Sequence, residues 1–193
     1  MKFLVAFVLT LIVASTTIKA QYANIGLKAG LNVSTLHWVP GPQDNSRVGY
    51  NIGLLAHIHV NPNFGIQPEL VYSTQGSTDY LGGTNNSTCL DYVNIPVMFQ
   101  FYFGYGFRFE VGPQLGILAS AKSISDGIPD DISDQLESVD FALGLGLSYV
   151  YIPSGFGFDF RYNIGLTDIT TDPNYNTFNR GIQLGIFYLI NHR

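Results

Sequence analysis

Apolar and polar residues alternate with a period of two through almost all of residues 24–191. This period is typical of half-buried β-strands, because successive side chains on a strand point to opposite faces. The pattern is clearest at 139–151, where Leu143, Leu145 and Leu147 alternate with small residues. It predicts eight strands, at about 24–36, 48–60, 64–76, 90–103, 107–121, 139–151, 156–168 and 178–191.

Short connections between these strands alternate with longer, polar ones. The short ones are "NPN" at 61–63, "GYG" at 104–106 and "PSG" at 153–155, which are turn sequences. Short turns at one end and long loops at the other indicate an all-β fold: an eight-stranded antiparallel up-and-down transmembrane β-barrel with short periplasmic turns and longer external loops. Because proline cannot donate to a strand ladder, Pro68, Pro96 and Pro113 are each expected at a bulge or a strand margin.

The volume of the side chains on each face of the strands decides which face points outward. A lipocalin-like barrel would keep the apolar residues inside, and a soluble sandwich would bury the aromatic rings in its core. The apolar set has about six large side chains per strand, whereas an eight-stranded interior holds a filled core or one small ligand. The set rich in glycine fits that interior better. The apolar face is therefore expected to contact lipid, with aromatic residues near both membrane interfaces.

Composition agrees with a membrane location. Hydrophobic residues make up 46% of the chain and charged residues 12%, which is little charge for a soluble secreted protein. The formal charge of -5 argues against a nucleic-acid partner. The single cysteine, Cys89, excludes an intramolecular disulfide.

Residues 1–20 have the features of a cleaved secretory signal peptide, with Lys2 before an apolar run and a predicted cut before Gln21. The apolar run is too short to span a bilayer. We therefore expect export and one outer-membrane β-barrel domain at 21–193, located in the cell outer membrane.

Several polar residues fall on the predicted inward face. They are Lys28, His57, Glu69, Arg108, Glu110, Asp159 and Arg161. The cations and carboxylates balance, and unpaired charge in a narrow lumen is costly, so we expect ion pairs. Gly144, Gly146 and Ser148 are expected to leave room for them, and Lys28 and His57 to be near neighbours. We interpret this set as structural packing rather than a proton path.

The external connections supply the candidates for interaction with partners. They are Trp38, Asp126, Asp130, Asp131, Asp134 and Glu137. Calcium prefers such carboxylates, but their spacing matches no EF-hand, which favours a solvated acidic loop. His57 and His59 lack a convergent third metal ligand, and no Ser, His and Asp grouping justifies a triad. The sequence therefore predicts no catalytic residue, metal or cofactor.

Four segments carry a family resemblance: "IGLKAGLN" at 25–32, "IQPELVYSTQG" at 66–76, "VNIPVMFQFYF" at 93–103 and "VGPQLGIL" at 111–118. In this order they resemble the outer-membrane β-barrel domain family of Bacteroidota, whose members are labelled porin-family or PorT-like. The resemblance implies an eight-stranded barrel without shared catalytic residues. PorT itself belongs to a secretion and gliding apparatus.

Four functions remain open from the sequence. The first is a closed structural or surface-interaction protein, embedded in outer-membrane lipid and binding protein partners through its external loops. The second is an accessory subunit of a PorT-like secretion or transport complex. A small pore is less favoured, because side chains would fill an eight-stranded lumen. A membrane-embedded hydrolase with its site at the loop end is also less favoured.

Overall fold

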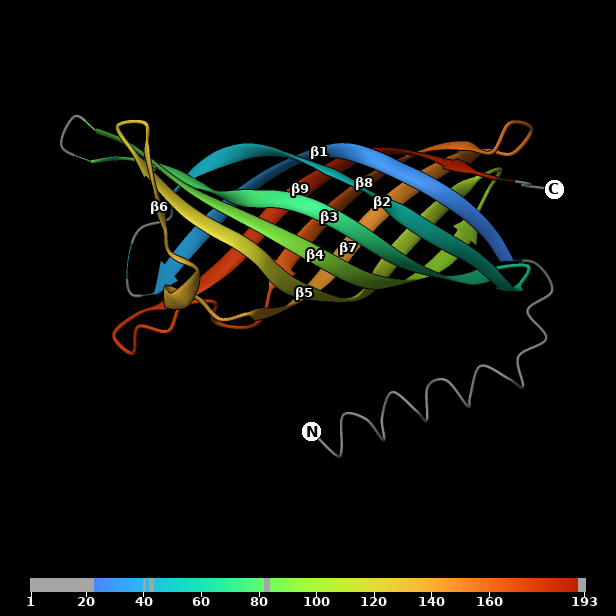
Figure 1. Ribbon diagram of the computed structural model, residues 1–193. Coiled ribbons are helices and arrows are strands. Elements are labelled where there is room, and N and C mark those ends of the chain that lie inside the picture. The colour runs from blue at the N-terminus through green and yellow to red at the C-terminus, as the bar shows by residue number, and fades with distance from the viewer. Residues whose placement is uncertain (1–22, 40, 42–43, 82–83, 191–193) are drawn as a thin grey trace.

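The chain forms a closed antiparallel β-barrel (Figure 1), seen in a computed structural model that describes residues 23–39, 41, 44–81 and 84–190. Eight strands make the wall: β1 (Ala23–Val39), β2 (Asn45–Asn61), β3 (Phe64–Leu81), β4 (Thr84–Phe103), β5 (Phe107–Ser125), β7 (Val139–Tyr151), β8 (Phe156–Gly165) and β9 (Asn176–Leu189). The short strand β6 (Ile128–Asp131) and the 3-10 helix η1 (Ser133–Gln135) follow β5. The predicted number and order of barrel strands are confirmed.

Every wall strand pairs with two neighbours. Pairing of β4 with β5 and of β1 with β9 closes the sheet, while β6 pairs with the last residues of β5. Closure leaves the wall without a free edge. The β2–β3, β4–β5 and β7–β8 connections lie at one end of the barrel, here called the short-turn end. The opposite end, where β6 and the remaining connections lie, is called the loop end.

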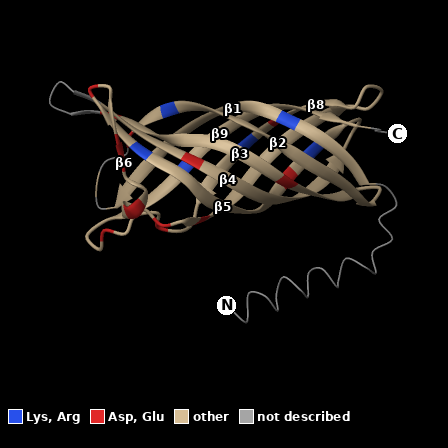
Figure 2. Ribbon diagram, in the orientation of Figure 1, with Lys and Arg blue, Asp and Glu red and all other residues tan. Residues whose placement is uncertain are grey.

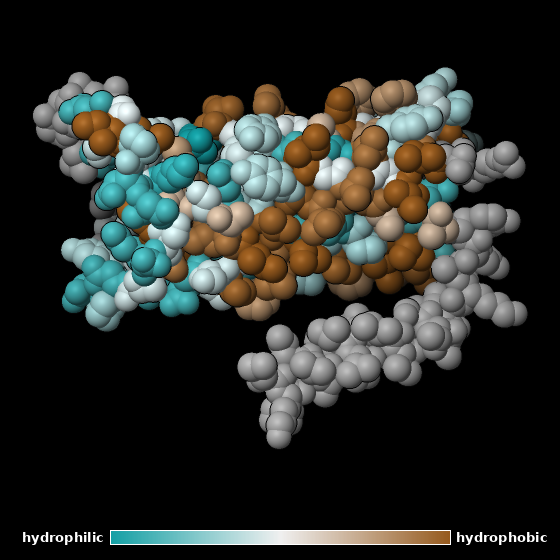
Figure 3. Space-filling view, in the orientation of Figure 1, coloured by the Kyte–Doolittle hydropathy of each residue, from teal (hydrophilic) through white to brown (hydrophobic). Residues whose placement is uncertain are grey.

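The two faces of each strand differ as the volume argument predicts. Phe158 is 64% exposed, whereas its neighbour Asp159 is 5% exposed. In β7, Gly144 and Gly146 are buried in the lumen, whereas Leu145 and Leu147 are exposed. Figure 3 shows apolar residues covering much of the barrel wall and polar residues gathered at the loop end. The outward-facing apolar set excludes both a lipocalin-like barrel and a soluble sandwich.

Aromatic rings gather outside the wall at both ends. Near the short-turn end, the ring centroids of Phe107 and Tyr149 are 4.8 Å apart. Nearer the loop end, Tyr50 and Tyr72 are 6.4 Å apart. Two such girdles are typical of barrels that cross an outer membrane, because aromatic side chains favour the interfaces.

Most strands extend further at the loop end than their apolar patterns indicate, and β3, β4 and β5 do so most. The β3–β4 ladder continues to the pair Leu81 and Thr84, so the expected long loop between 76 and 90 is wrong. Strand β5 likewise runs to Ser125. Loss of the apolar face marks where a strand leaves the membrane, whereas backbone pairing continues in water.

The expectation for the three prolines is also wrong. Pro68, Pro96 and Pro113 lie inside strands, and each has a partner in the ladder. The β4–β5 ladder skips two residues after Pro96 and resumes in the same register, while its register shift lies at Asp91 and Tyr92. Because the register is kept at Pro96, the side chains on either side of this proline keep their faces.

The expected signal peptide, residues 1–20, lies outside the described residues. In the ranges that the structure describes, no helix has the length and apolar character needed to cross a membrane.

Candidate functional site

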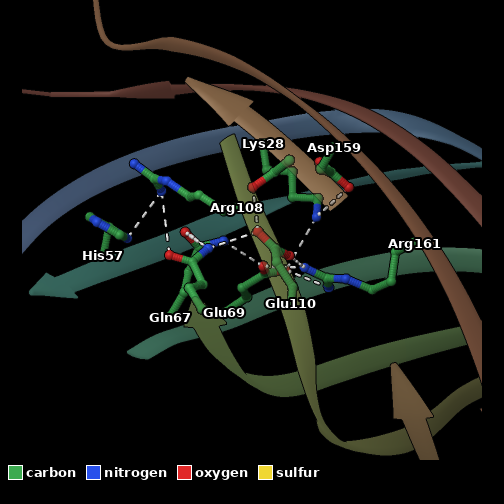
Figure 4. Close-up of polar contacts among 10 residues, drawn as sticks. Lys28, His57, Gln67, Glu69, Arg108, Glu110, Asp159 and Arg161 are labelled. Carbon is green, nitrogen blue, oxygen red and sulfur yellow. Dashed lines mark hydrogen bonds and ion pairs between the residues drawn. The ribbon is translucent and has the colours of Figure 1, made fainter. Parts of the chain in front are cut away.

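The middle of the lumen holds a network of charged side chains (Figures 2 and 4). All seven inward polar residues expected from the sequence are at most 5% exposed. They are Lys28, His57, Glu69, Arg108, Glu110, Asp159 and Arg161. Three cations and three carboxylates are therefore removed from water together, which is tolerated when they are well paired.

Arg161 is the centre of this network. Its Nη1 and Nη2 donate to the two carboxylate oxygens of Glu69 at 3.1 and 2.8 Å, and Nη2 also lies 3.1 Å from Glu110 Oε2. The fork geometry of a guanidinium suits such two-point contact with a carboxylate. Gly144 and Gly146 lie directly against the Arg161 side chain. As expected, Arg161 occupies the space that the missing side chains of these glycines leave in the lumen.

Lys28 joins the network from β1. Its Nζ lies 3.0 Å from Asp159 Oδ2 and 3.4 Å from Glu69 Oε2. The expected proximity of Lys28 and His57 is wrong, because Lys28 pairs with Gly53 in the β1–β2 ladder and His57 lies four positions further along β2. His57 instead contacts Arg108.

Neutral side chains complete the network. Gln67 donates to Glu69 at 2.9 Å, and Gln100 donates to both Gln67 and Glu110, at 2.9 and 2.8 Å. Ser148 donates to Glu110 at 2.6 Å. The alternation placed these residues on the inward face, and Ser148 was expected only to leave room for the charged side chains. Their hydrogen bonds were not predicted, because bonding across the lumen leaves no signal in the sequence.

Two apolar clusters block the lumen above and below the charges, which the sequence analysis missed. At the loop end the cluster is Leu36, Leu90, Tyr92, Ala121 and Ile169. At the short-turn end it is Leu55, Val150, Phe187 and Leu189. Most of these residues continue the inward alternation of their strands, so the pattern gave a signal for them. Ala121 follows a register shift in β5 and Ile169 lies outside the strands, so neither had such a signal. Together with the ionic layer they fill the bore with side chains.

Trp38 lies at the end of β1 rather than in an exposed loop. It is half-buried, its Nε1 donates to Asp44 Oδ2 at 3.0 Å, and its ring meets Tyr175 edge-on. Ser77 donates to the same Asp44 oxygen at 2.7 Å. The expectation that Trp38 lies in an external connection is therefore wrong.

The five acidic candidates between 126 and 137 are exposed. Asp131 accepts a hydrogen bond from the Ser133 backbone N–H at 2.9 Å, and bonding to Ser133 holds the pKa of its carboxyl below the usual value. Within the ranges that the structure describes, no three Asp, Glu, His or Cys side chains converge as metal ligands. The geometry gives no support to a calcium site in this segment.

Comparison with known proteins agrees with this architecture. Residues 15–171 match the family model described as outer membrane protein beta-barrel domain. The sequence search found no match among curated proteins.

Two solved barrels show the same fold. Neisserial surface protein A is 15% identical, with a TM-score of 0.60, and the alignment covers 88% of this chain and 99% of that one. Ail, the attachment invasion locus protein of Yersinia pestis, is also 15% identical, with a TM-score of 0.50 and coverage of 86% and 99%. At this identity the likeness establishes the fold, while the family match spans most of the sequence. The chain therefore belongs to the outer membrane protein β-barrel domain family.

Proposed function

We propose that this protein is a closed outer-membrane barrel that acts as a structural or surface-interaction protein through its external loops. The observation that carries the proposal is the filled lumen. Arg161, Gln67, Gln100 and Glu110 are among the largest fully buried side chains, and apolar clusters lie on both sides of them. Because side chains fill the lumen, we expect the protein to act through its external surface rather than by conducting solutes through the barrel.

The loop end offers an ordered surface for such contacts. The β3–β4 ladder and the β5–β6 hairpin both reach beyond the apolar wall, and carboxylates are concentrated there (Figures 1 and 2). Backbone pairing holds these projections in place, so a partner would meet a preorganised surface. Its negative charge favours partners with basic surfaces.

Two measurements test this function. Planar-bilayer recordings of the purified protein are expected to show no stepwise conductance. A reproducible unitary current would instead support the small-pore alternative. In cells, replacing 126–137 by a Gly/Ser linker is expected to reduce attachment to positively charged surfaces and leave folding intact. Tyr105→Ser, at the opposite end, is the matched control. Equal attachment by both variants would contradict the loop proposal.

One observation favours the second candidate, an accessory subunit of a PorT-like secretion complex in a Bacteroidota outer membrane. Tyr105 is 92% exposed in the β4–β5 turn, and Ile152 is 52% exposed in the β7–β8 turn. Apolar side chains on turns that would face the periplasm suit contact with another subunit. A photo-crosslinking residue at Tyr105 is expected to give a protein adduct of discrete mass in native membranes if this candidate is correct. Adducts with lipid alone would contradict it.

A further inference from the structure

A pocket of about 300 Å³ lies at the short-turn end of the barrel. All three short turns contribute to its rim, including Pro62 and Ile152. The rest of the lining consists of the polar side chains of His59, Tyr102 and Arg108, the ring of Phe107, and the turn residues Gly104 and Gly106. The pocket therefore combines apolar walls with hydrogen-bonding groups.

Arg108 differs from the other two lumen cations in its partners. Lys28 and Arg161 each contact two carboxylates. For Arg108, no carboxylate oxygen of the described residues lies within the 4.0 Å ion-pair distance. The ionic network is neutral in sum, but its negative charges gather around Lys28 and Arg161, which leaves a positive end at the pocket.

A neutral bridge joins Arg108 to the network. Its Nη1 donates to Gln100 Oε1 at 3.3 Å, and Gln100 in turn donates to Glu110 at 2.8 Å. An amide between guanidinium and carboxylate compensates the charge less than direct contact does. The guanidinium thus keeps capacity for an additional anion.

The hydrogen bonds around His57, whose contact with Arg108 is drawn in Figure 4, leave a second donor beside Arg108. Arg108 Nη1 lies 3.3 Å from His57 Nδ1, and because arginine can only donate, that nitrogen accepts. Neutral His57 then carries its proton on Nε2, which lies 3.3 Å from the Tyr102 hydroxyl oxygen. With that oxygen accepting, the Tyr102 hydroxyl keeps its own proton for donation, and Tyr102 is one of the lining residues of the pocket. The His59 ring packs against Tyr102 with centroids 5.2 Å apart.

We propose that this pocket binds a small apolar monocarboxylate that enters from the short-turn side. The carboxylate accepts hydrogen bonds from Arg108 and Tyr102, and the apolar body lies against Pro62, Phe107 and Ile152. A volume of about 300 Å³ is at the lower end of the range for small-molecule sites. This site is at the opposite end from the external loops and is independent of the function proposed for them.

Titration of the parent protein with hexanoate tests the proposal directly. The protein is labelled with ¹³C at histidine Cε1 and held in non-ionic micelles, with signals assigned through single His→Gln replacements. Saturable shifts of the His57 and His59 signals are expected, and His37 at the loop end is the internal reference. Hexan-1-ol and hexylammonium enter micelles but lack the carboxylate. Equal shifts with either of them, or no saturable shift with hexanoate, would overturn the proposal.

Variants identify the groups that bind. Arg108→Gln is expected to weaken hexanoate binding by about tenfold or more, as loss of a hydrogen bond to a charged group implies. Arg47→Gln is the matched control, because Arg47 is half-buried at the loop end and donates to the Gln75 carbonyl.

Heat-modifiable gel mobility verifies folding, and Tyr102→Phe supplies a second test if Arg108→Gln does not fold. Unchanged affinity in a folded variant of either residue would refute the assignment. Binding by a peptide carboxyl terminus without any hexanoate binding would also refute it and assign the pocket to a protein partner.

Discussion

Replacing Arg161 by Met is expected to destabilise the barrel strongly. The change removes two hydrogen bonds to Glu69 and one to Glu110, at 2.8–3.1 Å, from a site that is 1% exposed. Glu69 keeps Lys28 and Gln67, so it remains paired. Removing one partner from a buried ion pair costs about 3–5 kcal/mol. With an m-value of about 2 kcal/mol per M urea, the unfolding midpoint falls by roughly 2 M.

The measurement is reversible urea unfolding in lipid vesicles, followed by the fluorescence of Trp38, the single tryptophan. The double variant Arg161→Met with Glu69→Met separates pairing from packing. Met fills part of both spaces, Lys28 still pairs with Asp159, and Glu110 still accepts hydrogen bonds from Gln100 and Ser148. The double variant is therefore expected to lose less stability than the two single variants summed, by about 0.5–3 kcal/mol. Strict additivity would refute the view that the contact itself stabilises the fold.

The remaining predictions concern the wall, the strand contacts and the loop end. Leu145→Arg puts a charge on the lipid face and is expected to lower stability by about 2–4 kcal/mol, measured by the same urea titration; a midpoint equal to that of the parent would reverse the facing assignment. Gly112→Ala would place a Cβ 2.0 Å from the Val97 carbonyl oxygen, so its heat-modifiable folded band is expected to diminish, and full folding would contradict that close approach. Ser77→Ala removes the 2.7 Å bond to Asp44 and is expected to speed proteolysis between β1 and β2, while the barrel core stays resistant; parent-like cleavage rates would show that this bond does not hold the connection.

Strand alternation and side-chain volume were sufficient to predict the barrel and its facing. β7 illustrates this, because its observed bounds Val139–Tyr151 match the predicted strand and its leucines face outward while Gly144 and Gly146 face the lumen. The period of two is a direct consequence of the backbone pleat, so it is readable from sequence. The bulk of the apolar set then leaves one arrangement that fits inside a closed eight-stranded wall.

Strand ends were predicted less well for an identifiable reason. Apolar alternation reports contact with lipid, and it disappears where Ser77 and Thr78 leave the membrane although both still pair with β4. The environment of Trp38 had no local signal either, since its contacts with Asp44 and Tyr175 depend on how separate connections pack over the loop end.

The ion pairs show why inward residues were predictable while their partners were not. Lys28 has Gly53 and Phe187 beside it in the two ladders, and neither carries a charge. It reaches instead to Glu69 on β3 and Asp159 on β8, each beyond an adjacent strand. Such contacts depend on the tilt and stagger of the closed wall, and these are set by all the strands together. Gly53 beside Lys28 and Gly185 beside Asp159 leave space for this reach, so the placement of small residues contributes to the pairs together with the placement of charges.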